Sequence, residues 1–295
     1  RFYVERGQIK QIKTHKMKDI AVLLTVFNRC EKTISCLKNL YAQKLPKNVS
    51  FDVWLTDDNC TDDTPLVIAK EYPKVHILTS EGGLFWNRGM INAWEAAAKY
   101  KDYDAYLWLN DDTNLNKGAL EMLVKTADEA RWKKIIVGTF SKIDNPSIIT
   151  YGGRNAKKHL LRPSLNKAIE CSFFNGNIVL IPQFVYKVLG TNDPVFHHSL
   201  GDFDYGLRGM KKNIQSLIAP GILGECDRHE ALPSWCNPQK TLSQRWNAFH
   251  SPLGCNPKEF FIFEFRHYGF LRAYFHYMTI HIRLLFPQLW KTRKI

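Results

Sequence analysis

The chain has 295 residues, of which 45% are hydrophobic and 23% are charged, and this composition excludes a protein that is disordered throughout. The formal net charge of +13 predicts an anionic partner. Nucleic acid, anionic lipid and phosphate-bearing substrates are all possible partners of this kind. Seven cysteines without a repeated spacing argue against a disulfide framework and favour a reducing compartment. No uncharged apolar run reaches the roughly 18 residues that would predict a membrane-spanning helix.

Strand-like and helix-like segments alternate from Asp19 onward, and we expect residues 1–16 to be a leader or an expression remnant outside the fold. Continuous apolar runs with β-branched residues predict strands, and apolar residues at helical spacing predict the helices between them. The predicted strands are 20–26, 51–56, 75–78 and 105–109, and the predicted helices are 31–43, 65–72 and 90–100. This order predicts an α/β fold with a mostly parallel central sheet and helices on both faces.

The pattern is less regular after Thr139. A polar insertion around residues 157–162 is expected to be mobile. The remaining predicted elements are a buried segment at 173–181, helices at 184–188 and 202–211, and an apolar run at 214–218.

Polar and acidic residues follow each of the four predicted strands of the first half. They are Thr25 to Arg29, Asp57 to Asp63, Glu81 to Arg88, and Asn110 to Asp112. Because ligands bind at the carboxyl ends of the strands in such sheets, these four segments are expected to converge on one site.

The segment Asn110-Asp111-Asp112 ends the fourth predicted strand. Magnesium and manganese ions prefer oxygen ligands, and a magnesium-type ion commonly uses one or two carboxylates together with substrate phosphates. One alternative is a helix N-cap, formed by Asp112 or Thr113. A metal-dependent phosphatase could also use Asp111 and Asp112, but no other feature of the sequence supports one.

Asp58 lies in the acidic turn after the second predicted strand. Its carboxylate could accept the imide N–H of a pyrimidine base, an edge that uridine and thymidine share. The alternative is turn and capping chemistry, which we assign to the neighbouring Asp62 and Asp63.

Residues 82–89 are expected to form a flexible loop that leads into a helix. Its glycines would allow the backbone to approach a phosphate, and Arg88 could pair with a diphosphate oxygen. Trp86 is predicted to form a wall of the donor site, and the alternative is an ordinary turn in which Trp86 is a packing anchor.

The order of Thr25-Val26-Phe27-Asn28-Arg29, residues 58–64 and the acidic strand end resembles family 2 glycosyltransferases, which have the nucleotide-sugar-binding GT-A fold. Residues 174–177 and 201–208 resemble acceptor-side motifs of the branch that contains rhamnosyl- and galactofuranosyltransferases. The resemblance extends from about Asp19 to His229. It implies an inverting, metal-dependent transfer of a hexosyl or deoxyhexosyl unit from a UDP- or dTDP-sugar to a glycan or lipid-linked acceptor in cell-surface polysaccharide synthesis.

The resemblance also implies residue roles. Asp202 would be the catalytic base. The donor-binding residues would be Thr25, Phe27, Arg29, Asp58, Trp86, Arg88, Asn110 and Asp111. The metal ligands, for Mn²⁺ or Mg²⁺, would be Asp112 and His229. The acceptor-binding residues would be Asn175, Gly176 and Asp204.

Two positions depart from the family pattern, and several roles have structural alternatives. Asn110 stands where the family usually has the first carboxylate of an Asp-x-Asp motif, which leaves Asp112 as the main metal ligand. Gly201 replaces the usual acidic neighbour of Asp202. Asp202 could instead cap a helix, Asp204 could pair with Arg208 at i,i+4, and a lone histidine such as His229 is often structural.

The domain organisation implied by the resemblance is a GT-A domain at 17–235 and a helical extension at 236–295. The domain would divide into a nucleotide-binding half, 17–115, and an acceptor half, 116–235. Residues 258–295 are aromatic, basic and poor in acidic residues, which predicts binding to an anionic membrane surface. The alternative is packing on the catalytic domain or on a second subunit, so a homodimer is left open. The expected location is the cytoplasm, at the inner face of the cell membrane.

Proteins of two other classes were weighed against an enzyme. A non-catalytic nucleotide-sugar or glycan-binding module is favoured by Asn110 in the metal motif and disfavoured by Asp202. A nucleic-acid-binding protein would rest on the positive charge alone. Because the sequence has no helix-turn-helix, zinc-finger or RNA-recognition signature, no nucleic-acid partner is expected.

Overall fold

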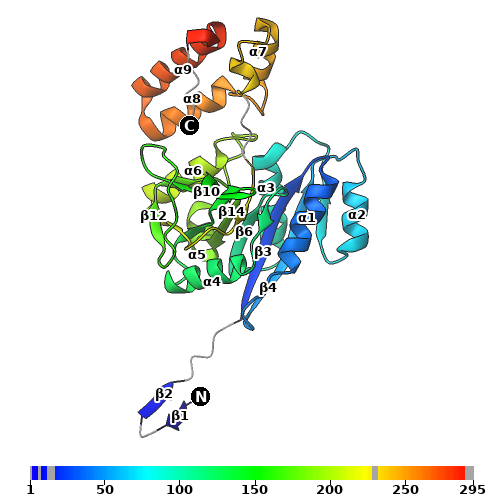
Figure 1. The fold of residues 1–295 in the computed structure, drawn as a ribbon, viewed down its shortest axis with the longest axis vertical. Coiled ribbons are helices and arrows are strands. Elements are labelled where there is room, and N and C mark those ends of the chain that lie inside the picture. Colours follow the sequence, from blue (N-terminus) through cyan, green and yellow to red (C-terminus); the bar gives the residue numbers. More distant parts are fainter. Residues whose placement is uncertain (1, 6–7, 12–16, 228–231, 290–295) are drawn as a thin grey trace.

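An eight-stranded β-sheet forms the centre of the molecule in the computed structural model (Figure 1). The structure describes residues 2–5, 8–11, 17–227 and 232–289. The strands of this sheet are β3 (Lys18–Val26), β4 (Val49–Asp57), β5 (His76–Thr79), β6 (Ala105–Leu109), β8 (Ile135–Val137), β12 (Ile169–Cys171), β14 (Ile178–Pro182) and β15 (Ser216–Ile218). Their order across the sheet is β12-β15-β8-β14-β6-β3-β4-β5.

Helices cover both faces of this sheet. They are α1 (Cys30–Tyr41), α2 (Thr64–Glu71), α3 (Phe85–Tyr100), α4 (Ala119–Glu129), α5 (Gln183–Leu189) and α6 (Gly201–Lys211). The C-terminal part contains α7 (Leu242–His250), α8 (Pro257–Tyr268) and α9 (Phe270–Leu285), with short 3₁₀ turns η1 (Ser234–Cys236) and η2 (Pro287–Leu289).

The sheet is mostly parallel, as predicted. β3 pairs in parallel with β4 and β6, and β4 pairs in parallel with β5. β14 is the exception in the middle of the sheet, because it runs antiparallel to both β6 and β8. The backbone N–H of Asn110, just past β6, donates to the carbonyl of Asn177, just before β14, at 3.0 Å. The chain therefore enters β14 from the edge at which β6 ends, which brings the Asn175–Asn177 motif next to the Asn110–Asp112 motif.

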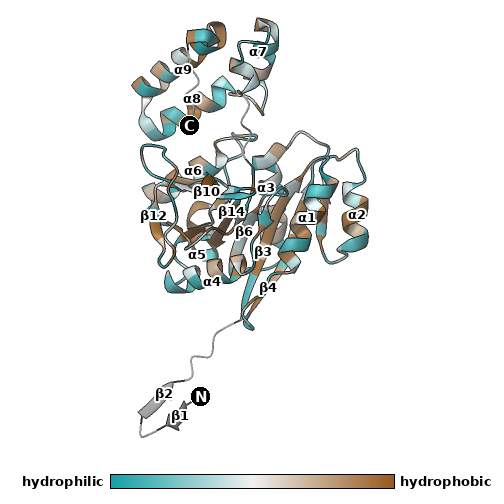
Figure 2. Ribbon diagram, in the orientation of Figure 1, coloured by the Kyte–Doolittle hydropathy of each residue, from teal (hydrophilic) through white to brown (hydrophobic). Residues whose placement is uncertain are grey.

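Alternate residues of β3 pack against opposite layers of helices, as the two-residue period of a strand requires. Val22 and Leu24 belong to a buried cluster with α1, α2 and α4. Ala21 and Leu23 belong to a second cluster with α3, α5 and α6, which includes Trp94. Figure 2 shows strongly hydrophobic stretches in the central strands and helices of mixed character around them. The continuous apolar run of β3 thus follows from burial on both faces.

Smaller strand pairs lie outside the central sheet. A four-stranded sheet has the order β10 (Asn145–Tyr151), β9 (Phe140–Lys142), β16 (Gly224–Glu225) and β7 (Asn114–Leu115). β11 (Gly153–Arg154) pairs with β13 (Phe173–Phe174), and β1 (Phe2–Glu5) pairs with β2 (Gln8–Gln11). Because β7 and β16 are neighbours, the segment after Asp112 lies beside Cys226, whose Sγ is 3.9 Å from Oδ1 of Asp112.

The start of α3 differs from the prediction, which began this helix at Met90. In the structure α3 begins at Phe85, so part of the expected flexible loop is helical. The cause is a side chain from another element, since the carboxylate of Asp58 accepts hydrogen bonds from the backbone N–H groups of Leu84 and Phe85. Satisfying free N–H groups in this way stabilises the first turn of a helix.

The C-terminal helices lie beyond the edge at which β3, β4 and β6 end (Figure 1). α8 packs on α9, and Phe263 of α8 is buried in a cluster with Phe196, with ring centroids 6.3 Å apart. One side of α8 therefore packs on the part of the chain that contains the central sheet, and this packing was the structural alternative for the C-terminal stretch. No helix among the described residues combines the length and the apolar character that crossing a bilayer requires.

Candidate functional site

The loops that follow β3 and β4 are joined at the carboxyl edge of the sheet. The backbone N–H of Asp58 donates to the carbonyl of Val26 at 3.0 Å. Oδ1 of Asn28 accepts the backbone N–H of Thr61 at 2.7 Å, and the side-chain amide of Asn28 donates to the Thr61 hydroxyl at 3.1 Å. The first two sequence motifs therefore form one continuous wall of the site.

Asp58 is buried and anchors the start of α3. Its Oδ1 accepts hydrogen bonds from the Ser80 hydroxyl and the backbone N–H of Leu84, and its Oδ2 accepts the backbone N–H of Phe85, each at 2.9 Å. A carboxylate offers about four lone-pair positions, so about one remains for another donor. The contact between Asp58 and a nucleotide base stays a prediction, and the structure adds this anchoring role.

Phe85 and Leu200 have left-handed backbone conformations, with φ of 56° and 74°. They stand at the starts of α3 and α6. This conformation is strained for bulky side chains, and such strain is often found at functional sites. The Asp58 carboxylate holds the N–H of Phe85, and the carbonyl of Leu200 accepts the N–H of Asp204 at 2.7 Å. These hydrogen bonds thus hold the strained residues in place at the N-termini of α3 and α6.

Arg29 bridges the two carboxylates that follow β6. Its Nη1 is 3.2 Å from Oδ1 of Asp111 and 3.2 Å from Oδ2 of Asp112. Asp111 is buried, and burial raises its pKa to about 6, although the positive charge of Arg29 opposes this rise. The charge of Asp112 raises the pKa of Asp111 further. The arrangement concentrates negative charge at one point of the carboxyl edge.

The residues Asp111 and Asp112 fit a divalent cation. Oδ2 of Asp111 is buried and has no hydrogen-bond partner within the described part of the chain, a costly state for a carboxylate oxygen. Mg²⁺ and Mn²⁺ take such oxygen ligands and need only one or two from the protein when phosphates supply others. The described residues contain no group of three or more His, Cys, Asp or Glu suited to a metal, and the predicted ligand His229 lies outside them.

Asn110 holds the ring of Trp86. The indole Nε1 of Trp86 donates to Oδ1 of Asn110 at 2.7 Å, and the ring lies edge-on to Trp108 of β6 with centroids 5.8 Å apart. Trp86 therefore serves as the packing anchor that was one interpretation of it, and its partly buried ring also lies at the site. The donor contacts of Trp86 and Asn110 stay predictions.

Gly176 lies between Trp86 and Asp202. A Cβ atom at Gly176 would be 2.6 Å from Cη2 of Trp86 and 3.3 Å from Cβ of Asp202. The backbone N–H of Gly176 donates to Oδ2 of Asp202 at 2.9 Å. Since Trp86 is bonded to Asn110, two positions before Asp112, the acidic strand end and Asp202 belong to one connected site.

Asp202 lies in the first turn of α6. Burial raises its pKa to about 6, while the N–H groups of Gly176 and Phe203 and the positive charge of Arg154 oppose the rise. The N–H of Phe203 donates to Oδ1 of Asp202 at 2.8 Å. A general base is most effective when its pKa is near the working pH. Asp202 is therefore ionised at neutral pH and is suited to accept a proton.

Three other predicted donor residues line the same edge. Thr25 lies against α3, because a Cβ at Gly89 would be 2.2 Å from its Oγ1. Phe27 is exposed at the end of β3. Nε of Arg88 donates to the carbonyl of Pro194 at 2.9 Å, so part of its guanidinium holds the loop before α6. The contacts of these residues with a donor stay predictions.

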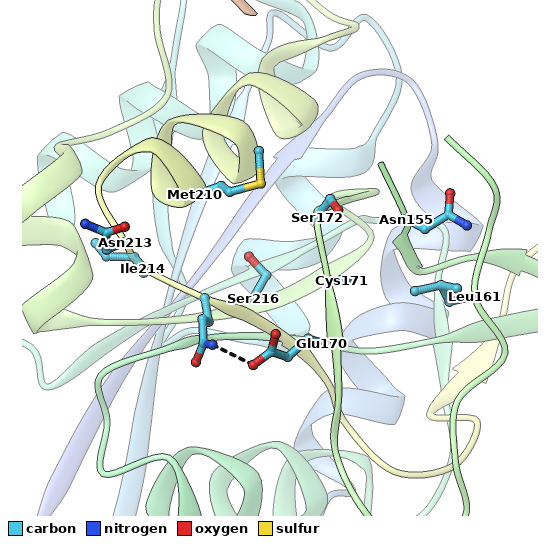
Figure 3. Close-up of a pocket in the computed structure, with 10 residues that line it drawn as sticks. Asn155, Leu161, Glu170, Cys171, Ser172, Met210, Asn213, Ile214 and Ser216 are labelled. Atoms are coloured by element: carbon cyan, nitrogen blue, oxygen red, sulfur yellow. Dashed lines mark hydrogen bonds between the residues drawn. The ribbon is translucent and has the colours of Figure 1, made fainter. Parts of the chain in front are cut away.

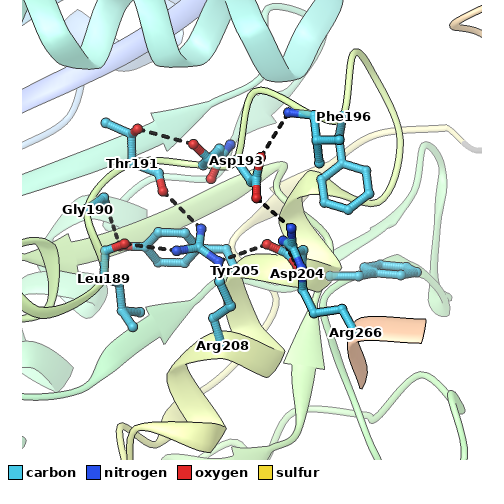
Figure 4. Close-up of polar contacts among 12 residues, drawn as sticks. Leu189, Gly190, Thr191, Asp193, Phe196, Asp204, Tyr205, Arg208 and Arg266 are labelled. Carbon is cyan, nitrogen blue, oxygen red and sulfur yellow. Dashed lines mark hydrogen bonds and ion pairs between the residues drawn. The ribbon is translucent and has the colours of Figure 1, made fainter. Parts of the chain in front are cut away.

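Asp204 does not reach the site, and its predicted acceptor contact is corrected. It is 0% exposed, its Oδ2 pairs with Nε of Arg208 at 2.8 Å, and its Oδ1 accepts hydrogen bonds from Arg266 and His267 at 2.8 Å (Figure 4). The expected i,i+4 pair with Arg208 is present. Burial alone would raise the pKa of Asp204, but the hydrogen bond from His267 and the charges of Arg208 and Arg266 hold it below its ordinary value.

Asn175 and Gly176 lie beside Asp202, in the segment that leads into β14. Oδ1 of Asn175 accepts a hydrogen bond from Nε of Arg154 at 3.2 Å, and the Arg154 guanidinium lies 5.7 Å from the ring of Phe203. Arg154 thereby places a positive charge near Asp202. The acceptor contacts of Asn175 and Gly176 stay predictions.

Asn87 positions the loop that precedes Asp202, a role that the sequence motifs did not mark. Its fully buried amide donates to the carbonyls of Asp193 at 2.9 Å and Phe196 at 2.8 Å. A signal was present, since helical spacing places Asn87 on the same face as the core residues Met90 and Trp94. A buried amide on such a face needs partners from another segment.

His198 is a second residue that the motifs missed. Its ring lies edge-on to Phe85 with centroids 6.5 Å apart, and its buried Nδ1 has no partner among the residues that the structure describes. Burial and the positive charge of Arg29 lower its pKa, so its imidazole is neutral at pH 7. No spacing rule in the sequence connects His198 with Arg29.

Comparisons with known proteins agree with this fold. The model of the family described as Glycosyl transferase family 2 matches residues 21–190. No curated protein sequence matches the chain. Among solved structures, the chain resembles S. aureus TarS in complex with UDP-GlcNAc, with a TM-score of 0.58 and 15% identity over 92% of this chain and 73% of that one.

Two further solved structures are similar. The mannosyltransferase PcManGT from Pyrobaculum calidifontis, in complex with GDP-Man and Mn²⁺, has a TM-score of 0.53 and 15% identity over 95% of this chain and 77% of that one. GalNAc-T7 with UDP, GalNAc and Mn²⁺ has a TM-score of 0.57 and 14% identity over 81% of this chain and 48% of that one. At these identities the similarity shows the fold, which is the predicted GT-A fold. Because the family model covers more than half of the sequence, this chain belongs to glycosyl transferase family 2.

Proposed function

We propose that the protein transfers a hexosyl or deoxyhexosyl unit, with inversion, from a UDP- or dTDP-sugar to a hydroxyl of a glycan or lipid-linked acceptor in cell-surface polysaccharide synthesis. The observation that carries this proposal is the connected path from the Asp111–Asp112 carboxylates through Asn110 and Trp86 to Asp202. One end of this path suits a cation and a diphosphate, and the other suits proton removal.

The reaction is a single displacement in which the acceptor hydroxyl attacks the anomeric carbon as the nucleotide diphosphate leaves on the opposite side. Asp202 accepts the hydroxyl proton, and general base catalysis typically contributes about 10²–10⁴-fold. The N–H groups of Gly176 and Phe203 fix the orientation of the Asp202 carboxylate. Trp86, held by Asn110, offers an aromatic surface beside the transferred sugar.

The leaving diphosphate needs positive charge. A Mn²⁺ or Mg²⁺ ion held by Asp112, with Asp111 beside it, would neutralise the negative charge that develops there. Arg29 contributes a guanidinium at the same place, and guanidinium groups bind phosphate oxygens by charge-assisted hydrogen bonds. The solved relatives in complex with GDP-Man or with UDP and GalNAc also contain Mn²⁺.

The proposal includes attachment of residues 258–295 to the anionic inner face of the cell membrane, where a lipid-linked acceptor would be located. Helix α9 leaves large apolar side chains exposed, including Leu271 at 84% and Phe275 at 63%. Apolar side chains on a helix within a basic segment favour an interfacial position. A second copy of the chain is the alternative occupant of this surface.

A donor-hydrolysis assay tests the proposal. The full chain is incubated with a panel of UDP- and dTDP-sugars, with and without Mn²⁺, and release of the nucleoside diphosphate is measured. We expect Mn²⁺-dependent release that falls by about 10²-fold or more in Asp202→Asn, which removes the base, and in Asp112→Asn, which weakens the cation site. Glu121→Gln, on the exposed side of α4, is the matched control and should keep the wild-type rate.

Donor binding by the same proteins separates catalysis from binding alone. A wild-type protein that binds a nucleotide sugar in a thermal-shift assay but releases no product would support the non-catalytic module instead. Equal rates in the wild type and Asp202→Asn would reject Asp202 as the base.

A further inference from the structure

A cavity of about 430 Å³ opens at the edge of the central sheet formed by β12 and β15. Sites for small molecules are commonly about 300–1,000 Å³ in volume, so this cavity is large enough for a ligand. Figure 3 shows Met210 of α6 and Asn213 across the cavity from Ser172 and Asn155. The cavity does not include Asp111, Asp112 or Asp202, so it is separate from the site described above.

The polar lining of this cavity consists of amides, hydroxyls and a single carboxylate, Glu170. The lining that the structure describes contains no lysine or arginine, although the whole chain carries a net charge of +13. A phosphate or another anion would therefore find no positive side chain there and would meet the charge of Glu170. The chemistry favours a neutral ligand with many hydroxyl groups.

Several polar groups of the lining are available to such a ligand. Nε2 of Gln215 donates to Oε1 of Glu170 at 2.5 Å, which leaves the amide oxygen of Gln215 and the second oxygen of Glu170 as acceptors. The hydroxyls of Ser172 and Ser216 form no hydrogen bond within the described residues. The half-exposed side chain of Met210 adds an apolar surface of the kind that packs on the C–H face of a sugar ring.

Arg154 connects the cavity to the acceptor side of Asp202. Its carbonyl accepts the N–H of Ser172, in the cavity lining, at 2.8 Å. Its Nε donates to Oδ1 of Asn175, whose neighbour Gly176 donates to Asp202. In this order of contacts Gly176 comes after Asn175 and contacts both Asp202 and Trp86, and Trp86 leads to the acidic strand end.

We propose that this cavity binds neutral sugar residues of a glycan acceptor, at a distance from the hydroxyl that reacts. The inference rests on the proposed function, because an acceptor must approach Asp202 from the side opposite the leaving diphosphate. The leaving group belongs at Asp111 and Asp112, and the cavity lies at the other end of the path. Met210 follows Asp202 by eight positions in α6, which corresponds to roughly 12 Å along the helix. An acceptor of several sugar residues spans that separation.

Direct binding to oligosaccharides tests this cavity. The probes are maltotetraose, chitotetraose and mannotetraose, titrated into the full chain and followed by calorimetry or saturation-transfer NMR. We expect at least one neutral tetrasaccharide to bind the wild type. The double variant Glu170→Ala/Gln215→Ala should weaken its Kd about tenfold or more, because two hydrogen-bonding groups are lost. Both residues are exposed, so the fold should be kept.

The matched control is Glu121→Ala/Gln239→Ala, which removes the same residue types from exposed positions elsewhere and should bind like the wild type. Met210→Ser provides a second variant of the cavity if melting curves show that the first is unfolded. Equal binding by cavity and control variants, or no binding of any probe by the wild type, would overturn the inference.

Wild-type donor hydrolysis, measured on the same preparation, distinguishes the two proposals. Mn²⁺-dependent hydrolysis together with unaltered or absent tetrasaccharide binding rejects the cavity inference and keeps the proposed function. Loss of tetrasaccharide binding in the cavity variants without any hydrolysis by the wild type keeps the saccharide site and rejects the transferase activity.

Discussion

The protonation of Asp202 is the property of a single residue on which the proposed chemistry depends most directly. Burial makes its carboxylate a better proton acceptor, while two backbone N–H groups and Arg154 keep it ionised at neutral pH. Asp204, two positions along α6, is also an aspartate but has the opposite shift, because His267 and two arginines surround it. Identical side chains two positions apart on one helix therefore differ in pKa, and their neighbours decide which of them can act as a base.

The pH dependence of the reaction follows from the pKa of Asp202. A base acts only when ionised, and the pKa of Asp202 is raised to about 6, so the rate should be full above that pH and fall as the pH drops through it. Below this point we expect a loss of about tenfold per pH unit in donor hydrolysis at saturating donor. Arg154→Met should shift this fall in rate to higher pH, because the positive charge of Arg154 lowers the pKa of Asp202.

The control for this pH profile is Lys125→Met, at an exposed position on α4. It should leave the pH at which the rate falls unchanged. A rate that stayed constant well below pH 6 in the wild type would contradict the role of Asp202.

Helix α8 is the element that holds helix α6, which carries Asp202. Arg266 pairs with Asp204 at 2.8 Å and with Asp193 at 2.7 Å, so a single side chain fastens both α6 and the loop before it (Figure 4). Glu259 adds a contact to the same loop through the backbone N–H of His197 at 3.1 Å. The C-terminal extension is therefore part of the structure that positions Asp202, whatever surface its other side contacts.

Arg266→Met should destabilise the protein by about 3 kcal/mol, because it removes one partner from the fully buried Asp204 carboxylate. Chemical denaturation measures this change as a lower midpoint. Arg266→Lys should recover part of the lost stability, because lysine restores the positive charge but cannot contact two carboxylates at once as the guanidinium does. Lys125→Met is the control, and a midpoint for Arg266→Met equal to that of this control would show that α8 does not anchor α6.

At the scale of the whole molecule, the carboxyl edge of the sheet and the C-terminal helices lie at the same end (Figure 1). The residues that follow β3, β4 and β6 and the exposed face of α9 are thus found at one end of the molecule. If α9 lies on a membrane, this end of the molecule is the one closest to a lipid-linked acceptor.

Vesicle binding tests the exposed face of α9. Leu271→Ser/Phe275→Ser should weaken binding to phosphatidylglycerol vesicles by at least about tenfold, because burying each apolar side chain contributes roughly 1.5–3 kcal/mol. Leu66→Ser/Leu165→Ser changes side chains that are equally exposed, at 70% and 81%, but lie far from α9 in the sequence. Sedimentation with vesicles measures both. Similar losses in the two double variants, or no loss in either, would exclude α9 as the membrane contact.

The sequence by itself determined the alternation of strands and helices in the first half, because continuous apolar runs are stable only when both faces of a strand are covered. It also located four of the segments that meet at the site, since residues after parallel strands necessarily gather at one edge. The family followed from the motifs at these strand ends, and the match of the family model over residues 21–190 confirms it.

Only the tertiary structure decided the partners of buried polar groups. Asp58 starts α3 because Leu84 and Phe85, which follow a different strand, meet its carboxylate. Asp204 is excluded from the site because Arg266 and His267 reach it from α8, in a region whose sequence reads as a surface helix. A buried charge can be paired by a residue from any part of the chain that folding brings close to it. The local sequence pattern does not show which distant residue that will be.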